Sequence, residues 1–288
     1  MQLSSCLHLD LEFSCSAAAI IAGCDVYERV KHTQIGASES AQVYIGTSGW
    51  HYKHWLGTFY PEKTPASKML AFYITKFDTV ELNNSFYHLP SKLSMNAWHD
   101  NTPENFVFAV KGSRFLTHMK KLKDARQGLE RFLDAAEELK EKLGPILFQL
   151  PPNWELNIER LDEFLSILPT YHRYTFEFRN PTWETEEIHN LLAARNASYC
   201  IYDLAGYQSP LQITTDFSYI RLHGPGGKYQ GTYTDAALST WADRVVEWSH
   251  TLKSVYVYFD NDQAGFAAQD ALRLKQLVST RLTTKQVG

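Results

Sequence analysis

Eight short segments rich in β-branched and aromatic residues recur along the chain, and longer segments of helical periodicity separate them. We expect strands at residues 43–48, 79–83, 106–111, 145–150, 174–179, 198–203, 218–223 and 255–260. Strands that alternate with helices indicate parallel strand–helix–strand units. Eight such units in about 240 residues predict an α/β fold of the (β/α)8 TIM-type barrel class.

The intervening segments predict helices at residues 67–77, 92–100, 124–144, 157–168, 183–195, 235–252 and 266–278. The segment at 124–144 is the clearest, because its apolar residues recur at helical spacing and Gly144 supplies a stop signal. The connection after residues 198–203 is short and gives no clear helical pattern. An open doubly wound sheet is the alternative fold, but no glycine-rich dinucleotide-binding motif follows the first strand.

The chain divides into one barrel domain and two terminal segments. We expect the barrel at residues 43–280, an N-terminal extension at 1–42 that is poorly ordered or peripheral, and a C-terminal tail at 281–288. The apolar run at residues 15–25 is too short to span a bilayer, and no Lys or Arg precedes it as a signal peptide requires. We therefore expect no membrane contact.

The cysteine pattern indicates the cellular compartment, and the net charge limits the expected partners. Cysteines at positions 6, 15, 24 and 200 form neither a zinc-binding pattern nor a dense disulfide framework, which favours the cytoplasm. The formal net charge of -4 at pH 7 gives the whole chain no attraction for nucleic acid, so such binding would need a local basic patch.

Polar residues stand at or just after the end of nearly every predicted strand. They are Glu81, Asn83, Lys111, Gln149, Glu177, Arg179, Asp203, Arg221, His223, Asp260, Asn261 and Asp262. The carboxyl ends of barrel strands share one face of the molecule, and that face carries the active sites of TIM barrels. We therefore expect a functional site there. The alternative is a structural network of ion pairs that closes the top of the barrel.

Three of these residues are candidates for acid–base chemistry. Glu81 and Glu177 are the best candidates, since Arg179 and Arg221 would keep a neighbouring carboxylate ionised. His223 is a candidate for proton transfer near neutral pH. No cofactor is evident. A divalent metal held by His223, Glu177, Glu81 and Asp203 stays open, although no H-x-H or H-E-x-x-H spacing occurs.

Two segments suggest an anionic ligand. Residues 224–228, GPGGK, follow Arg221, and a glycine-rich loop lets backbone N–H groups approach an anion, although it equally suits a mobile lid. Residues 111–126 hold six Lys or Arg and one Asp, which fits an anionic ligand or a solvated helix start. Aromatic residues after the first strand could stack on bases or sugars. The predicted binding residues are Trp50, Tyr52, Asn83, Lys111, His118, Gln149, Arg179, Arg221 and Asn261.

Seven motifs in order resemble the DUF72, or YecE-like, family. They are GTSGWHYKHWLGTFYP, FDTVELNNSFYHLP, FVFAVKGSRFLTH, LGPILFQLPPNW, FEFRNPTW, YIRLHG and VYVYFDND, and they extend from Val43 to about Val278. The resemblance implies a TIM-type barrel without a settled activity, and a suggested likeness to endonuclease IV-type barrels implies a link to nucleic acid. Asn84-Ser85 and Asn180 depart from the family pattern, and the second departure weakens a role for a His at that position.

Three functions are compatible with these residues. The first is a hydrolase-like barrel that acts on or binds a phosphate-bearing substrate, such as a phosphodiester, nucleotide or nucleic acid. The second is a non-catalytic protein that binds nucleotide or nucleic acid. The third is a carbohydrate-active barrel, which needs two carboxylates flanking one bond. An anionic small molecule or nucleic acid is thus the expected partner, and the oligomeric state stays open.

Overall fold

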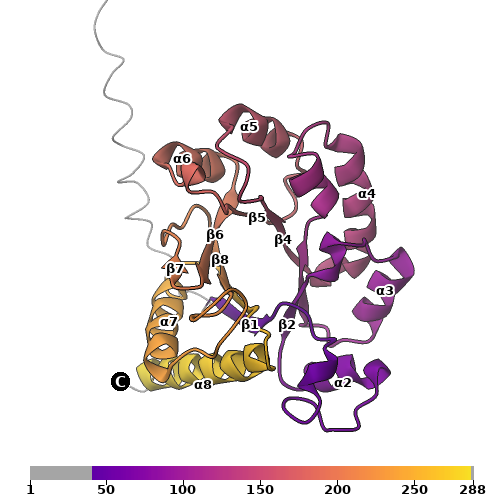
Figure 1. Cartoon of the computed structure of the whole chain (residues 1–288), viewed down its shortest axis with the longest axis vertical. Coiled ribbons are helices and arrows are strands. Elements are labelled where there is room, and N and C mark those ends of the chain that lie inside the picture. Colours follow the sequence, from indigo (N-terminus) through magenta and orange to yellow (C-terminus); the bar gives the residue numbers. More distant parts are fainter. Residues whose placement is uncertain (1–40, 287–288) are drawn as a thin grey trace, which may run out of the picture. The chain divides into compact units, whose positions relative to one another are not determined.

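A computed structural model describes residues 41–286. Eight parallel strands form the ring seen in Figure 1, in the order β1-β9-β8-β6-β5-β4-β3-β2. They are β1 (Gln42–Thr47), β2 (Thr79–Leu82), β3 (Val107–Lys111), β4 (Leu143–Gln149), β5 (Tyr174–Glu177), β6 (Ala197–Leu204), β8 (Phe217–Leu222) and β9 (Ser254–Phe259). The ring is nearly closed where β1 meets β2, through the Gly49 N–H, which donates to the Glu81 carbonyl at 2.8 Å. The predicted TIM-type fold is confirmed.

Helices lie outside the ring of strands (Figure 1). They are α2 (Met69–Tyr73), α3 (Lys92–Asp100), α4 (Arg126–Ala136), α5 (Ile158–Ser166), α6 (Glu186–Ala194), α7 (Asp235–Trp248) and α8 (Phe266–Gln286). No helix lies between β6 and β8, where the short strand β7 (Tyr207–Gln208) pairs antiparallel with β6. The helix predicted at 124–144 is shorter, because α4 gives way to a 3-10 helix at Glu137–Lys142 and the backbone of Lys140 is non-helical, with φ 50°. Beyond this break Lys142 donates to the carbonyls of His99 and Thr102 at 2.6 and 2.8 Å.

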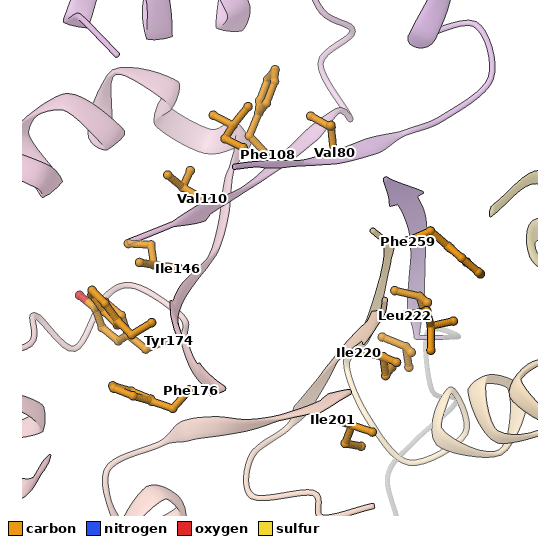
Figure 2. Packing of buried hydrophobic residues seen from close by; sticks show 14 of the residues in the cluster. Val80, Phe108, Val110, Ile146, Tyr174, Phe176, Ile201, Ile220, Leu222 and Phe259 are labelled. Carbon is orange, nitrogen blue, oxygen red and sulfur yellow. The ribbon is translucent and has the colours of Figure 1, made fainter. Parts of the chain in front are cut away.

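Alternating strand residues divide the core into two layers. Figure 2 shows one set, including Val80, Phe108 and Ile220, pointing away from the middle of the ring. The opposite set fills the barrel with aromatic rings, such as Tyr44 and Tyr256, which stack with centroids 5.0 Å apart. Because side chains fill the barrel, a ligand has access only at its ends.

The structure describes little of the predicted N-terminal extension but most of the predicted C-terminal tail. Of the N-terminal extension only residues 41 and 42 are described, and Gln42 begins β1; the apolar run at 15–25 lies outside the described residues. The predicted tail at 281–288 starts inside α8, because Arg281 donates to Asp243 at 2.7 Å and to Ser239 and so holds this part of the helix against α7. No helix within residues 41–286 is long and apolar enough to cross a bilayer.

Closure of the ring depends on a glycine in β1. A Cβ atom on Gly46 would lie 2.4 Å from the Thr79 carbonyl oxygen of β2. We expect Gly46→Ala to lower the free energy of unfolding by about 1–3 kcal/mol, the usual cost of overpacking. Gly226→Ala is the matched control, since its Cβ would meet nothing within 4 Å. Urea denaturation of both variants measures the difference, and equal stabilities would contradict close packing at this seam.

Candidate functional site

Arg221 occupies the centre of the carboxyl-terminal end of the barrel. Its side chain is fully buried and comes from β8. Its Nη1 donates to Glu177 Oε2 at 2.7 Å, and its Nη2 donates to Glu81 Oε1 at 2.8 Å and to Asp260 Oδ2 at 3.2 Å. One guanidinium therefore links carboxylates supplied by β5, by β2 and by the residue after β9.

The two buried glutamates have further partners for every carboxylate oxygen. Glu81 accepts from the hydroxyls of Ser48 and Tyr219, the latter at 2.6 Å. Glu177 accepts from Arg179 Nε, and the Cys200 thiol lies 3.8 Å from its Oε2. Hydrogen bonds of this number make the buried charges tolerable and fix the side chains in place.

The charges of this site stabilise one another. Burial opposes ionisation of Glu177, but Arg179 and Arg221 hold its pKa well below the usual range. Burial likewise opposes ionisation of Asp260, yet a hydrogen bond from His223 and the charge of Arg221 lower its pKa. Burial disfavours the guanidinium of Arg221, whose pKa its carboxylate neighbours nevertheless raise. The ionised forms are therefore the stable ones at neutral pH.

His223 takes a defined tautomer from its two neighbours. Arg179 Nη2 lies 2.8 Å from His223 Nε2, and a guanidinium can only donate, so Nε2 is the acceptor. The proton then resides on Nδ1, which donates to Asp260 Oδ2 at 3.0 Å. Arg179 also stacks over the Tyr202 ring at 4.7 Å. We call Glu81, Glu177, Arg179, Arg221, His223 and Asp260 the charged cluster.

Lys111 at the end of β3 differs from the other cations at this end of the barrel. Its side chain is only 6% exposed, and within residues 41–286 it has neither a hydrogen bond nor an ion pair through Nζ. The ammonium lies 4.3 Å from the centre of the Phe86 ring. Burial, and after it the charge of Arg221, lower the pKa of Lys111 to about 8.

His118 contacts the same aromatic ring as Lys111. It contacts the Phe86 ring edge to face at 4.9 Å, and its Nδ1 is 2.9 Å from the Thr117 hydroxyl. Burial and then the charge of Lys111 lower the pKa of His118 to about 4. The imidazole is therefore neutral at pH 7 and adds no charge to this side of the mouth.

Gln149 and Arg179 line a cavity of about 380 Å³ that opens beside the charged cluster. Tyr202, Lys228 and Tyr229 also line it, so the glycine-rich loop after β8 forms one of its walls. Gln149 Oε1 is buried and has no hydrogen-bond partner among the described residues. Polar groups of this kind in a concave, partly aromatic pocket are typical of a ligand site.

The remaining predicted binding residues lie elsewhere. Trp50, Tyr52 and Asn83 line a separate cavity of about 720 Å³. Asn261 Nδ2 donates to the Gly231 carbonyl at 2.9 Å and to Asp270 at 2.8 Å. Asn261 therefore anchors the glycine-rich loop, which is a role that its position after β9 did not indicate.

The sequence-based set of site residues omitted several members of the site. Asp260 was noted as a strand end without a role, although it contacts both Arg221 and His223. Ser48 and Tyr219 are uncharged, and apart from the alternation of strand residues nothing in the sequence indicated that they contact Glu81. Asp203, considered as a metal ligand, has no hydrogen bond to the charged cluster through its side chain. Within residues 41–286 no three His, Cys, Asp or Glu side chains are grouped to hold a metal.

An eight-stranded parallel barrel with a charged cluster at the carboxyl ends of its strands defines a TIM-type barrel protein. The chain belongs to the family described as "Protein of unknown function DUF72", whose profile matches residues 44–287. It is 26% identical over 273 residues to the UPF0759 protein YunF of Bacillus subtilis, covering 82% of this chain and 94% of that protein.

Solved structures agree with this assignment. A DUF72 family protein of Thermotoga maritima is 31% identical and superposes with a TM-score of 0.76, covering 83% of this chain and 99% of the other. A DUF72 family protein of Enterococcus faecalis shares the fold at 20% identity with a TM-score of 0.70, covering 84% and 99%.

Loss of the central cation should destabilise the barrel. We expect Arg221→Met to lower the free energy of unfolding by about 3–5 kcal/mol, because it leaves buried carboxylates without their partner. Arg195→Met is the matched control, since Arg195 pairs with Asp162 on the surface and such pairs contribute about 1 kcal/mol or less. Urea unfolding at pH 7 measures both. Equal losses would show that the charged cluster adds no more than a surface pair.

Proposed function

We propose that the mouth of this barrel binds a phosphate-bearing ligand. The observation that carries the proposal is Lys111, a buried cation that lies over the Phe86 ring but has no hydrogen bond or ion pair through Nζ among the described residues. An ammonium in that position costs free energy of folding unless an anion compensates it. Evolution of a purely structural cluster would favour a paired or apolar residue there, so the unpaired charge suits an anion from outside.

The groups around Lys111 support the same reading. Lys111, Gln149 and Arg179 follow three adjacent strands, β3, β4 and β5, and so form one arc of the mouth. Gln149 brings an amide, and Arg179 brings a planar guanidinium that pairs well with phosphate oxygens. Both terminal nitrogens of Arg221 already donate to carboxylates and its side chain is fully buried, so we assign it, with Glu81 and Glu177, to positioning the arc rather than to direct contact.

Phosphate affinity should follow the protonation of Lys111. The ammonium binds the anion and is present below the pKa of about 8, so affinity should fall about tenfold per pH unit above that value. Inorganic phosphate and ribose 5-phosphate, titrated calorimetrically from pH 7 to 9.5, test this expectation. Lys111→Met should abolish the pH dependence and weaken binding, whereas the exposed Lys120→Met should do neither. Failure of both phosphates to bind at millimolar concentration would overturn the proposal.

We further propose that the ligand is a phosphate ester and that His223 is the base in its hydrolysis. An anion that engages Arg179 would free the Nε2 lone pair of His223, which then takes a proton from water. The water oxygen bonds to phosphorus, the ester P–O bond breaks, and the Lys111 ammonium protonates the departing oxygen. Asp260 would stabilise the resulting imidazolium through Nδ1–H. A glycosidase role has less support, since all four oxygens of the two buried glutamates have protein partners.

Catalysis and binding can be separated by a pair of variants. With bis(p-nitrophenyl) phosphate we expect His223→Gln and Asp260→Asn to lower kcat by about 10²- to 10⁴-fold, the usual contribution of a general base. Lys111→Met should instead raise KM, because p-nitrophenolate leaves readily without a proton from Lys111 and the lost ammonium is then felt mainly in binding. Turnover measured by p-nitrophenolate release decides the matter. A wild-type protein that binds phosphate yet turns over no ester would identify a non-catalytic binding protein and remove the hydrolytic step.

A further inference from the structure

The larger cavity at this end of the molecule has no role in the proposal above. It lies between the loop after β1, α2, the end of β2 and α3, which Figure 1 shows as neighbours. Its volume of about 720 Å³ is in the range of small-molecule sites. We call it the aromatic cavity, because Trp50 and Trp98 line it with ring centroids 5.2 Å apart and planes at 90°.

The polar lining of the aromatic cavity consists of amides with one lysine, one histidine, a tyrosine and a serine. Three amides, from Asn83, Asn84 and Asn101, reach it together with Lys68, and no Asp or Glu lines it. Asn83 Oδ1 is buried and accepts no hydrogen bond among the described residues. A ligand that fits would therefore present a flat face to one of the two indoles and hydrogen-bonding groups to the amides.

A short turn joins the aromatic cavity to Lys111. Asn83 and Asn84 line the cavity, and two residues further on Phe86 lies under the Lys111 ammonium. Ser85 fixes this turn by donating to the carbonyl oxygens of Leu82 at 2.9 Å and Lys111 at 2.6 Å. The aromatic cavity and the Lys111 ammonium are thus linked through one short turn of the chain.

We propose that the aromatic cavity binds the nucleobase of a nucleotide whose phosphate lies at Lys111; this inference rests on the proposed function. Indole faces stack on any base, and an Asn amide offers the adjacent donor and acceptor that match a base edge. A sugar would also stack, but the phosphate-binding arc beside the cavity favours a ligand that carries both a planar ring and a phosphate. The expected class is therefore a mononucleotide.

The experiment compares whole and partial ligands by calorimetry. The ligands are the four ribonucleosides, their 5′-monophosphates, ribose 5-phosphate and maltose. We expect at least one monophosphate to bind about 10-fold or more tightly than ribose 5-phosphate, the contribution of one stacked base. Trp98→Ala and Asn83→Ala should remove that advantage and leave ribose 5-phosphate unaffected. Trp248→Ala, at the remote end of α7, is the control for losing an indole.

The outcomes separate this inference from the proposed function. Equal affinities of all monophosphates and ribose 5-phosphate would overturn the nucleobase site while leaving the phosphate site intact. Nucleosides that bind with ribose 5-phosphate silent would support the cavity and overturn the phosphate site. Binding of maltose in place of nucleosides, lost in Trp98→Ala, would make the cavity a sugar site and overturn the inference. If Trp98→Ala does not fold, Asn83→Ala alone decides.

Discussion

The polar end of the barrel depends on one fully buried guanidinium. Arg221 contributes a single buried cation to three carboxylates that come from distant parts of the chain. Each carboxylate would be costly to bury without partners. Arg179 and Arg221 lower the pKa of Glu177, and His223 and Arg221 lower the pKa of Asp260. Folding and charge compensation are therefore linked here, because strands β2, β5, β8 and β9 must all be in place before Arg221 meets its three carboxylates.

A structural network and a functional site are not exclusive alternatives in this arrangement. All the carboxylate oxygens of Glu81 and Glu177 have partners within the protein. These two side chains are therefore fixed in place and act as a rigid support for the neighbouring residues of the mouth. Two cations retain capacity for a ligand. Arg179 donates to Glu177 through Nε and stacks on Tyr202, and Lys111 has no hydrogen bond or ion pair through Nζ in the described part of the chain. Groups whose hydrogen bonds are made within the protein thus hold in place the groups that can still bind a ligand, which is the arrangement that preorganisation requires.

The sequence was sufficient for the fold and for the ends of the strands, but not for the contacts between them. Alternation within each strand put Arg221 and His223 on one face, and the rule that sites lie at the carboxyl ends of barrel strands brought Glu81, Glu177 and Arg179 to the same region. Which cation lacked a partner could not be predicted, because pairing depends on side-chain reach across the ring. For the same reason Asn261 was expected in the site, although its amide holds a loop.

The path of the chain after the strands also differed from the expectation, and this path determines where a ligand can lie. Trp50 and Asn83 both follow strand ends, yet the chain turns outward after them and they line a cavity between β2 and α3 rather than the mouth. Turn geometry of this kind is set by local contacts such as those of the Ser85 hydroxyl, which have no signature in hydrophobic periodicity. Because the same turn carries the aromatic ring beneath Lys111, displacing it would disturb the aromatic cavity and the cation together. The aromatic cavity and the Lys111 ammonium are thus coupled through the turn at residues 83–86, so a ligand that moves this turn would affect both.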